Sequence, residues 1–333
     1  MRETKTTMRR RLGKDGPEVS AIGLGCMSLS GVYGPFEERE GIALIHRAIE
    51  LGVDHLDSSD MYGWGQNEEL LGRALKGRRE RVLVATKFGQ VRRPGGSNGV
   101  DGRPEHVAAA CEASLKRLES DHIDLYYQHR VDPAVPVEET VGAMARLVEA
   151  GKVRHLGLCE ARPERIARAH RVHPIAAVQS EYSLLYREEA SEIRATTTRL
   201  GIAFVAYAPL GRSLLAGALP DPGALAEGDT RRRHPRFAAE NLPNNRALAE
   251  SFEKIAEGKG VTPAQLALAW LLAQGEDVIA IPGTKEIRRL EENLGALDCR
   301  LSAAEIERID RAIPPGAVAG SRYPEAQMRG VYL

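Results

Sequence analysis

Cysteine is scarce in this sequence: only Cys26, Cys111, Cys159 and Cys299 occur among 333 residues, and no two form a C-x-x-C pair. This usage is typical neither of a disulfide scaffold nor of a zinc site, and it fits a reducing compartment. Long apolar runs are also missing, because no segment approaches the roughly 18 residues that span a bilayer. The basic N-terminus lacks the apolar stretch of a secretory signal. We therefore expect a cytoplasmic protein that does not bind membranes.

An excess of charge of either sign is missing too. Lys and Arg number 46, Asp and Glu number 46, and the formal net charge is zero. This balance argues against a nucleic-acid-binding protein, and we interpret the arginine-rich runs at 76–81 and 231–236 as solvated surface. The nine histidines include no H-E-x-x-H motif, so we predict no metal site.

Short β-rich runs alternate with amphipathic helical segments along the chain. The strand candidates are Ala21–Met27, His55–Ser59, Val82–Phe88, Ile123–His129, His155–Cys159, Ala177–Tyr182, Phe204–Pro209 and Val278–Gly283. Such alternation indicates parallel strands joined by helical crossovers, and eight uninterrupted units favour a closed barrel over an open sheet. We therefore predict an α/β protein in which residues 1–333 form one (β/α)₈ TIM barrel domain.

Two segments fall outside this alternation. Arg9–Ile22 has the pattern of a short N-terminal β-hairpin turning at Asp15-Gly16, and we expect it to cover the bottom of the barrel. Gly211–Pro243 is a long loop after the seventh strand, rich in proline, glycine and arginine. A loop of this length on the catalytic face of a barrel usually serves as a lid over substrate or cofactor.

The glycines of Gly23-Leu24-Gly25 follow the first strand signal and partly match a dinucleotide-binding motif. That motif requires a third glycine, and Ser28 occupies its position. We interpret these glycines as residues that pack closely at a strand end, and not as part of a Rossmann fold.

Four polar side chains lie at or just beyond the ends of three successive strand candidates. Asp57 ends the second strand, with Tyr62 in the following loop, while Lys87 and His129 end the third and fourth. The carboxyl ends of barrel strands face the active-site mouth. Singly, each residue is explained by capping, solvation or local hydrogen bonding. Together they predict that a carboxylate, a phenol, an ammonium and an imidazole converge on one site.

Seven ordered motifs resemble those of the aldo-keto reductase family over nearly the whole chain: HLDSSDMYGWGQNEELLG, VLVATKFG, IDLYYQHRVDP, HLGLCEA, AVQSEYSLL, VAYAPLGRSLLAG and VIAIPGTKEIRRLEEN. The segments DSSDMYG, QHRVDP and IPGTK are most similar to the bacterial branch of short-loop aldehyde and ketone reductases. The resemblance implies NADPH-dependent reduction of a small carbonyl substrate.

The resemblance implies that Asp57, Tyr62, Lys87 and His129 form the catalytic tetrad. Carbonyl reduction needs a proton donor that also stabilises the developing oxyanion. A phenol does both, but its ordinary pKa near 10 makes it a weak acid at neutral pH. An adjacent ammonium lowers that pKa, which is the role expected for Lys87, with Asp57 holding the lysine. His129 would orient the carbonyl.

The resemblance also implies a site for NADPH (NADP⁺). Tyr207 matches the aromatic platform for nicotinamide, and Cys159, Glu160 and Gln179 match positions that hold its carboxamide. Cys159 departs from the usual serine, and a thiol is a weaker hydrogen-bond partner. The other implied contacts are Leu210, Gly211, Arg212 and Ser213 over the pyrophosphate, Gly283, Thr284, Lys285 and Arg289 at the adenosine 2′-phosphate, and Glu292 and Asn293 at the adenine.

Two other functions remain open at this point. Lys87 could form a Schiff base, as a barrel lysine does in aldolases, although the nicotinamide-type motifs count against it. The chain could also serve as an interaction protein, since potassium-channel β subunits share this fold and cofactor site. Trp64 is expected at the wall of the carbonyl pocket or in packing. The substrate-facing loops and the oligomeric state have no readable code.

Overall fold

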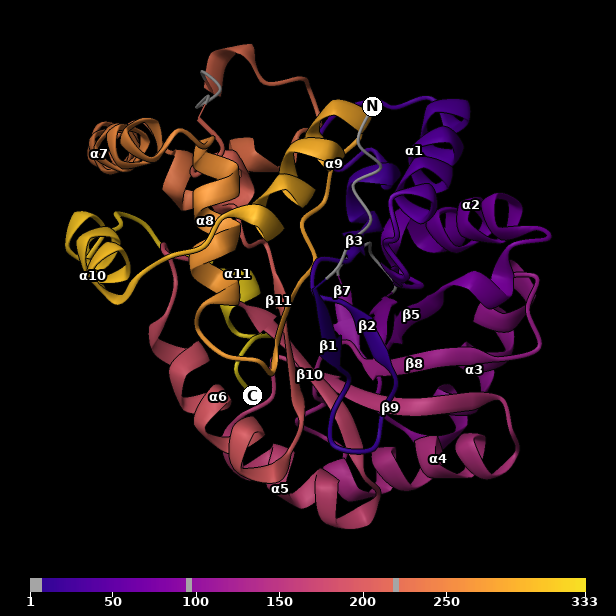
Figure 1. The fold of residues 1–333 in the computed structure, drawn as a ribbon. Helices are drawn as coiled ribbons and strands as arrows, with labels where there is room; N and C mark the ends of the chain where they lie inside the picture. The colour runs from indigo at the N-terminus through magenta and orange to yellow at the C-terminus, as the bar shows by residue number, and fades with distance from the viewer. Residues whose placement is uncertain (1–7, 94–97, 218–221) are drawn as a thin grey trace.

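The computed structural model describes residues 8–93, 98–217 and 222–333. In this part of the chain, parallel strands form an eight-stranded sheet in the order β12-β11-β10-β9-β8-β5-β4-β3. The sheet closes on itself, because Ile22, just before β3, forms a parallel bridge with Ala280 of β12. Helices surround the strands (Figure 1). The predicted (β/α)₈ barrel is confirmed.

The barrel strands are β3 (Leu24–Gly25), β4 (His55–Asp57), β5 (Leu83–Phe88), β8 (Ile123–Gln128), β9 (Val153–Cys159), β10 (Ile175–Glu181), β11 (Ala203–Tyr207) and β12 (Val278–Ala280). The helices are α1 (Glu38–Glu50), α2 (Gln66–Leu75), α3 (Pro104–Arg117), α4 (Val137–Glu149), α5 (Pro163–Val172), α6 (Glu188–Leu200), α7 (Leu242–Lys259), α8 (Pro263–Leu272), α9 (Ile287–Leu294), α10 (Ala303–Ala312) and α11 (Glu325–Met328). The eight strand candidates all correspond to these strands, with shifted ends.

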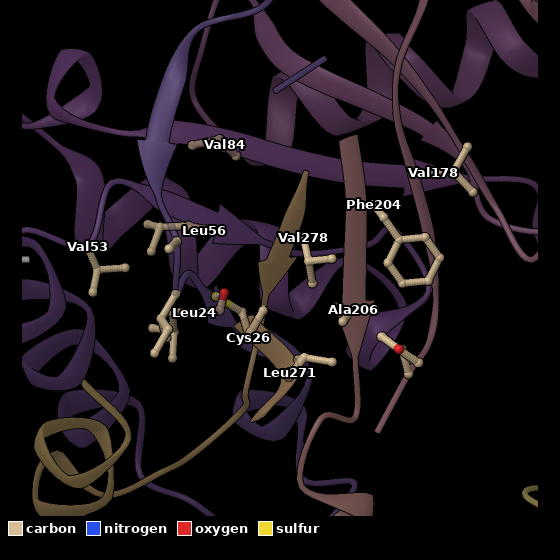
Figure 2. Packing of buried hydrophobic residues seen from close by; sticks show 14 of the residues in the cluster. Leu24, Cys26, Val53, Leu56, Val84, Val178, Phe204, Ala206, Leu271 and Val278 are labelled. Carbon is tan, nitrogen blue, oxygen red and sulfur yellow. Dashed lines mark hydrogen bonds between the residues drawn. The ribbon is translucent and has the colours of Figure 1, made fainter. Parts of the chain in front are cut away.

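Successive side chains of each strand point alternately outward and inward, as β-geometry requires. The outward side chains pack against the helices in one large apolar cluster, which includes Leu56, Val84, Phe204 and Val278 (Figure 2). The inward side chains form a second cluster inside the barrel: Leu12, Val19, Leu83, Ala85, Leu125, Tyr127, Cys159, Ala177, Ala203, Val205, Ile279 and Ile281. The barrel interior is therefore a packed core.

The glycines near the first strand permit close packing, as expected. A Cβ on Gly23 would lie 2.8 Å from the carbonyl oxygen of His55, and a Cβ on Gly25 would lie 2.7 Å from that of Ile281. Neither position has room for a side chain. Both glycines serve the packing of the barrel strands and not a dinucleotide-binding turn.

The N-terminal hairpin pairs β1 (Arg9–Arg11) with β2 (Glu18–Ser20) in antiparallel register. Its connecting loop, which includes Asp15 and Gly16, carries Leu12 into the interior cluster, where its side chain is fully buried. Leu83 and Ala203, the first residues of β5 and β11, belong to the same cluster. The hairpin therefore closes the amino-terminal end of the barrel, as predicted.

The opposite end of the barrel carries longer connections. The segment after β5 contains a second hairpin of β6 (Gln90–Arg92) and β7 (Asn98–Val100). The loop after β11 begins with a 3₁₀ turn at Gly211–Ser213 and runs to α7, where Leu242 begins the helix. The described part of this loop contains further 3₁₀ turns at Thr230–Arg233 and Pro235–Phe237.

Candidate active site

The alternation of the strands explains why the expected site residues face one space. Lys87 is in phase with the inward Leu83 and Ala85 on β5, and Tyr207 is in phase with Ala203 and Val205 on β11. The same phase turns Asp57, Cys159 and Gln179 inward at the ends of their strands. Because the strands are parallel, these ends meet at the carboxyl-terminal mouth of the barrel.

Lys87 lies at the centre of the predicted tetrad. Its Nζ donates to Asp57 Oδ1, to the Ser58 carbonyl oxygen at 2.7 Å and to the Tyr62 hydroxyl oxygen at 3.2 Å. The side chain is fully buried, and the Asp57 side chain is 2% exposed. Gln179 Nε2 donates to the other carboxylate oxygen of Asp57 at 2.7 Å. The ammonium thus has three partners, and the carboxylate is held on both oxygens.

Tyr62 has an elevated pKa in this arrangement. Burial raises the pKa of Tyr62, the Lys87 ammonium lowers it, and the net result is a pKa of about 12. Lys87 therefore acts in the expected direction but does not outweigh burial. Burial also opposes the charge of Lys87 itself, but Asp57 overcomes this effect and raises the pKa of Lys87. The pair at neutral pH is a charged ammonium and a protonated phenol.

His129 lies beside the phenol, with its ring centroid 6.0 Å from that of Tyr62 in an edge-on arrangement. Its Nδ1 lies 3.0 Å from the Ser59 hydroxyl oxygen. Burial, and then the charges of Arg130 and Lys87, hold the pKa of His129 well below its usual range. The imidazole is therefore neutral at pH 7.

A cavity of about 790 Å³ opens above these groups. Asp57, Tyr62 and His129 line it, while Lys87 lies behind them. From the barrel mouth the cavity extends to the segment after β12 and to the first turns of α9. Its size is that of a small-molecule or cofactor site.

Among the described residues, no group of three or more His, Cys, Asp or Glu side chains could hold a metal ion. The same residues contain no helix long and apolar enough to cross a membrane.

A comparison with known families matches residues 21–314 to the aldo/keto reductase family. The chain belongs to the aldo/keto reductase family. Its members are oxidoreductases, so this protein is an enzyme of that class. A probable aldo-keto reductase 1 of Glycine max is 48% identical over 320 residues, covering 94% of this chain and 91% of its own. Aldo-keto reductase yakc of Schizosaccharomyces pombe is 46% identical over 331 residues, covering 97% of this chain and 96% of its own.

Solved structures of family members share the fold. A glycerol dehydrogenase from Gluconobacter oxydans is 27% identical and superposes with a TM-score of 0.83 over 100% of this chain and 98% of its own. An aldo-keto reductase from Bacillus halodurans, solved in its holo form, is 29% identical and superposes with a TM-score of 0.77 over 92% of this chain and 96% of its own.

The residues that the family resemblance assigns to the cofactor fall into two groups. Most of the residues implied for the cofactor line the cavity: Gln179, Tyr207, Leu210, Arg212, Ser213, Gly283, Thr284, Lys285, Arg289, Glu292 and Asn293. Cys159, Glu160 and Gly211 do not, because their side chains or backbone are buried in the wall.

The turn at Gly211–Ser213 has an unusual backbone. Gly211, Arg212 and Ser213 have φ values of 56°, 57° and 86°, all in the left-handed region. Such conformations cost about 1–3 kcal/mol each for non-glycine residues and concentrate at ligand-binding loops. Arg212 does not extend freely into the cavity, since its guanidinium makes a double hydrogen bond to Glu181, at 3.2 and 2.9 Å.

The basic residues after β12 are also engaged. Lys285 Nζ donates to the carbonyl oxygens of Tyr33 and Pro35, both at 3.0 Å, and thereby joins the segment after β12 to the loop before α1. Arg289 Nη1 donates to Glu292 Oε2 at 2.7 Å. Both side chains remain partly exposed.

Glu160 occupies an environment that the sequence did not predict. Its carboxylate accepts hydrogen bonds from Arg322 at 2.8 and 2.7 Å, and from the Tyr207 hydroxyl at 2.8 Å. Arg322 comes from the C-terminal segment and is fully buried, and the neighbouring Tyr323 lies 3.1 Å from the Tyr207 hydroxyl oxygen. The C-terminal segment thus anchors the strand ends, and no motif marked its residues.

Cys159 is also withdrawn from the cavity. Its side chain is 1% exposed, and burial raises the pKa of the thiol to about 12. The thiol is therefore protonated at neutral pH and is not a nucleophile.

One of the two positions considered for Trp64 is wrong, and so is the solvation expected for one residue of an arginine-rich run. Trp64, considered for the pocket wall, is 38% exposed and lies under the Arg92 guanidinium, outside the cavity lining. In the run 231–236, Arg236 is only 4% exposed, because it pairs with the buried Glu181 at 3.0 Å. An arginine-rich run in a loop resembles solvated surface unless its distant carboxylate partner is known.

Proposed function

We propose that this aldo-keto reductase reduces an aldehyde or ketone to the alcohol with NADPH, and that Tyr62 donates the proton. The observation that supports this most directly is the buried set of contacts from Lys87 to Asp57 and Tyr62 at the mouth of a cavity. Family membership supports the general reaction, and this geometry supports the roles that we propose for the residues.

Several residues fit a nicotinamide dinucleotide. Tyr207 lines the same cavity as Asp57 and Tyr62, and its hydroxyl is held by Glu160, so we propose that its ring packs against the nicotinamide. Gly283 lines the cavity, and a Cβ at this position would lie 2.9 Å from the carbonyl oxygen of Gly25, so the backbone there has no room for a side chain. When bound, the reduced nicotinamide supplies the hydride.

The side chains of the tetrad control the transfer of the Tyr62 proton to the carbonyl oxygen. Lys87 donates to the Tyr62 oxygen, which leaves the phenol's own proton free to be donated to a carbonyl oxygen. The ammonium stabilises the phenolate that forms when this proton leaves. If Ser59 donates to Nδ1, neutral His129 carries its proton on Nε2 and orients the carbonyl by a hydrogen bond.

The choice of NADPH over NADH is supported by charge. The yeast relative is named for NADP(+), and Lys285 and Arg289 line the cavity where the family binds the 2′-phosphate. Lys285 and Arg289 lie four residues apart, and Arg289 belongs to the first turn of α9, a favourable position for an anion. A phosphate would compete with Glu292 for the Arg289 guanidinium.

The Schiff-base alternative is disfavoured by the state of Lys87. A nucleophilic lysine must be accessible and deprotonated. Lys87 is fully buried, has three hydrogen-bond acceptors and is held charged by Asp57.

The test is a turnover assay on the purified protein with aldehydes, ketones, sugars and quinones. We expect NADPH consumption matched by alcohol formation, and weaker consumption of NADH. NADPH binding without turnover of any carbonyl would contradict the proposal. If the protein bound NADPH without turnover and also captured a membrane partner, the alternative role as an interaction protein would be favoured instead.

A further inference from the structure

Arg130 directly follows the orienting histidine. Strand β8 ends at Gln128, and the next two residues, His129 and Arg130, both line the cavity. Arg130 is half-buried, and its Nη1 donates to the His129 carbonyl oxygen at 2.7 Å. The charge of Arg130 also contributes to the low pKa of His129. The guanidinium therefore lies beside the place where the carbonyl would be held.

In the described part of the chain, Arg130 differs from the other buried and half-buried arginines around the cavity in having no carboxylate partner, whereas the exposed Arg233 also has none. Within the described ranges, no carboxylate oxygen lies within 4.0 Å of its guanidinium. The other buried and half-buried arginines are matched: Arg212 and Arg236 by Glu181, Arg231 by Asp229, Arg289 by Glu292, and Arg322 by Glu160 and Glu189. Lys87 is likewise matched by Asp57. Among the described residues, Arg130 is thus the half-buried arginine of the cavity that no carboxylate pairs.

The carboxylate that acts on Arg130 from a distance, Glu160, is already paired with Arg322, and several neighbouring cavity residues are uncharged. Gln90 and Val100 of the β6–β7 hairpin line the cavity, as do Tyr323 and Pro324 of the C-terminal segment. The hairpin is adjacent, because the Arg130 carbonyl oxygen would lie 3.8 Å from a Cβ on Gly89. A half-buried charge without a counter-ion is costly, and a bound anion would relieve that cost.

We infer that Arg130 binds a carboxylate of the substrate, so that the preferred substrates are aldehydes or ketones that carry a carboxylate group. This inference rests on the proposed carbonyl reduction and names its substrate class. A planar guanidinium matches a carboxylate through two parallel hydrogen bonds. The single charge of Arg130 balances the single charge of a carboxylate, whereas a phosphate, with up to two charges, would call for a second cation beside Arg130.

The test compares 4-carboxybenzaldehyde with its methyl ester, which differ in the charge of one group. In the wild-type enzyme we expect kcat/KM for the acid to exceed that for the ester. Arg130→Met should lower the acid-to-ester ratio by about ten- to a hundredfold, the effect of a hydrogen bond to a charged group. Arg130→Lys should keep part of the preference. The 2- and 3-carboxy isomers would report the spacing between carbonyl and carboxylate.

A matched control is Arg233→Met. Arg233 also lines the cavity and is exposed, but it lies in the loop after β11 and, unlike Arg130, makes no hydrogen bond to His129. We expect the acid-to-ester ratio to stay unchanged in this variant. An equal fall of the acid-to-ester ratio in both variants would show that the preference for the acid comes from the overall positive charge of the cavity. That result would overturn the role of Arg130.

A binding measurement separates this inference from the proposed function. Calorimetric titration of 4-(hydroxymethyl)benzoate and its methyl ester into the protein with NADP⁺, and without it, requires no turnover. We expect the acid to bind more tightly than the ester, and Arg130→Met to remove the difference. Equal binding of both by the wild type would overturn the inference even if carbonyl reduction is found. Tight acid binding without turnover would contradict the proposed reaction and leave Arg130 as the anion site.

Discussion

At the scale of single residues, the central feature is a charged lysine with no exposure to solvent. Burying an ammonium is costly unless it is paired and hydrogen-bonded. Lys87 meets both conditions through Asp57, the Ser58 carbonyl and Tyr62. The chain thus keeps a positive charge against the phenol that we propose as the acid.

Lys87→Met tests this coupling. Without the ammonium, the pKa of Tyr62 should rise above its value of about 12, and carbonyl reduction at neutral pH should fall by roughly 10²–10⁴-fold, the range of general acid catalysis. A pH–rate profile checks the prediction, and profiles that superimpose on those of the wild type would contradict it. Lys87→Arg should rescue little, since a guanidinium does not occupy an ammonium's position.

The stability of this variant must be measured alongside. Removing one partner of a buried ion pair typically costs about 3–5 kcal/mol of unfolding free energy. Rates are therefore compared below the melting transition of the variant. A protein that is folded by circular dichroism and still slow would locate the defect in the chemistry.

Arg289→Ala tests the cofactor assignment. We expect the Kd for NADPH to rise by about ten- to a hundredfold, as for the loss of a hydrogen bond to a charged group, while NADH binding changes little. The effect should shrink at high salt, because the side chain is partly exposed. Fluorescence titration of both cofactors measures it. Equal weakening of NADH and NADPH would show that Arg289 contacts something common to both.

The sequence predicted Asp57, Tyr62, Lys87 and His129 as one group because strand ends of a parallel barrel must converge. It did not predict the pairing of Glu160 with Arg322, because 162 positions separate the two residues and no local pattern links them. Likewise, the sequence predicted that the Lys87 ammonium lowers the pKa of Tyr62. The net pKa depended on burial, which only the fold determines.

At the scale of elements, the loop after β11 is fastened to the barrel by one buried carboxylate. Glu181, the last residue of β10, accepts from Arg212 and Arg236, both of which lie in this loop. Burial raises the pKa of Glu181, but the two guanidinium groups outweigh it and lower the pKa to about 2. The clamp holds the turn that carries Arg212 and Ser213 over the cavity.

Glu181→Gln should loosen this loop and lower the unfolding free energy by about 3–5 kcal/mol near neutral pH. Because the folded pKa lies below the ordinary value of about 4.3, the contribution of Glu181 is present above that value. It is lost as the pH falls toward about 2. Urea unfolding at several pH values should therefore show the wild type and the variant converging in acid.

Glu138→Gln is the matched control for this experiment. It removes an exposed ion pair with Arg168 on the outer helices, and such pairs contribute little. A destabilisation as large as that of Glu181→Gln would contradict the view that burial gives the Glu181 clamp its strength.

At the scale of the whole molecule, the barrel is closed at one end and open at the other. The hairpin of β1 and β2 fills the amino-terminal end with Leu12, while the cavity occupies the carboxyl-terminal end. The alternation of strands and helices along the sequence predicted this architecture, since helical crossovers join parallel strands. It could not predict the β6–β7 hairpin, which is short and partly exposed and lacks a strong apolar pattern.

Leu12→Ala should therefore reduce stability without changing the chemistry. Truncating a fully buried leucine typically costs about 2–5 kcal/mol, and Leu12 is 0% exposed. Denaturant unfolding measures the loss, with Lys14→Ala, an exposed position in the same loop, as the control. Turnover per folded molecule should match that of the wild type. Equal stability of the two variants would show that the hairpin is not part of the core.

The most direct test of the account is the turnover of Tyr62→Phe, which removes the proposed acid and keeps the ring. We predict a loss of roughly 10²–10⁴-fold in kcat for carbonyl reduction, with the Kd for NADPH nearly unchanged and the fold intact. Retention of more than about a tenth of wild-type kcat, well above that range, would mean that another group donates the proton, and would contradict the central claim.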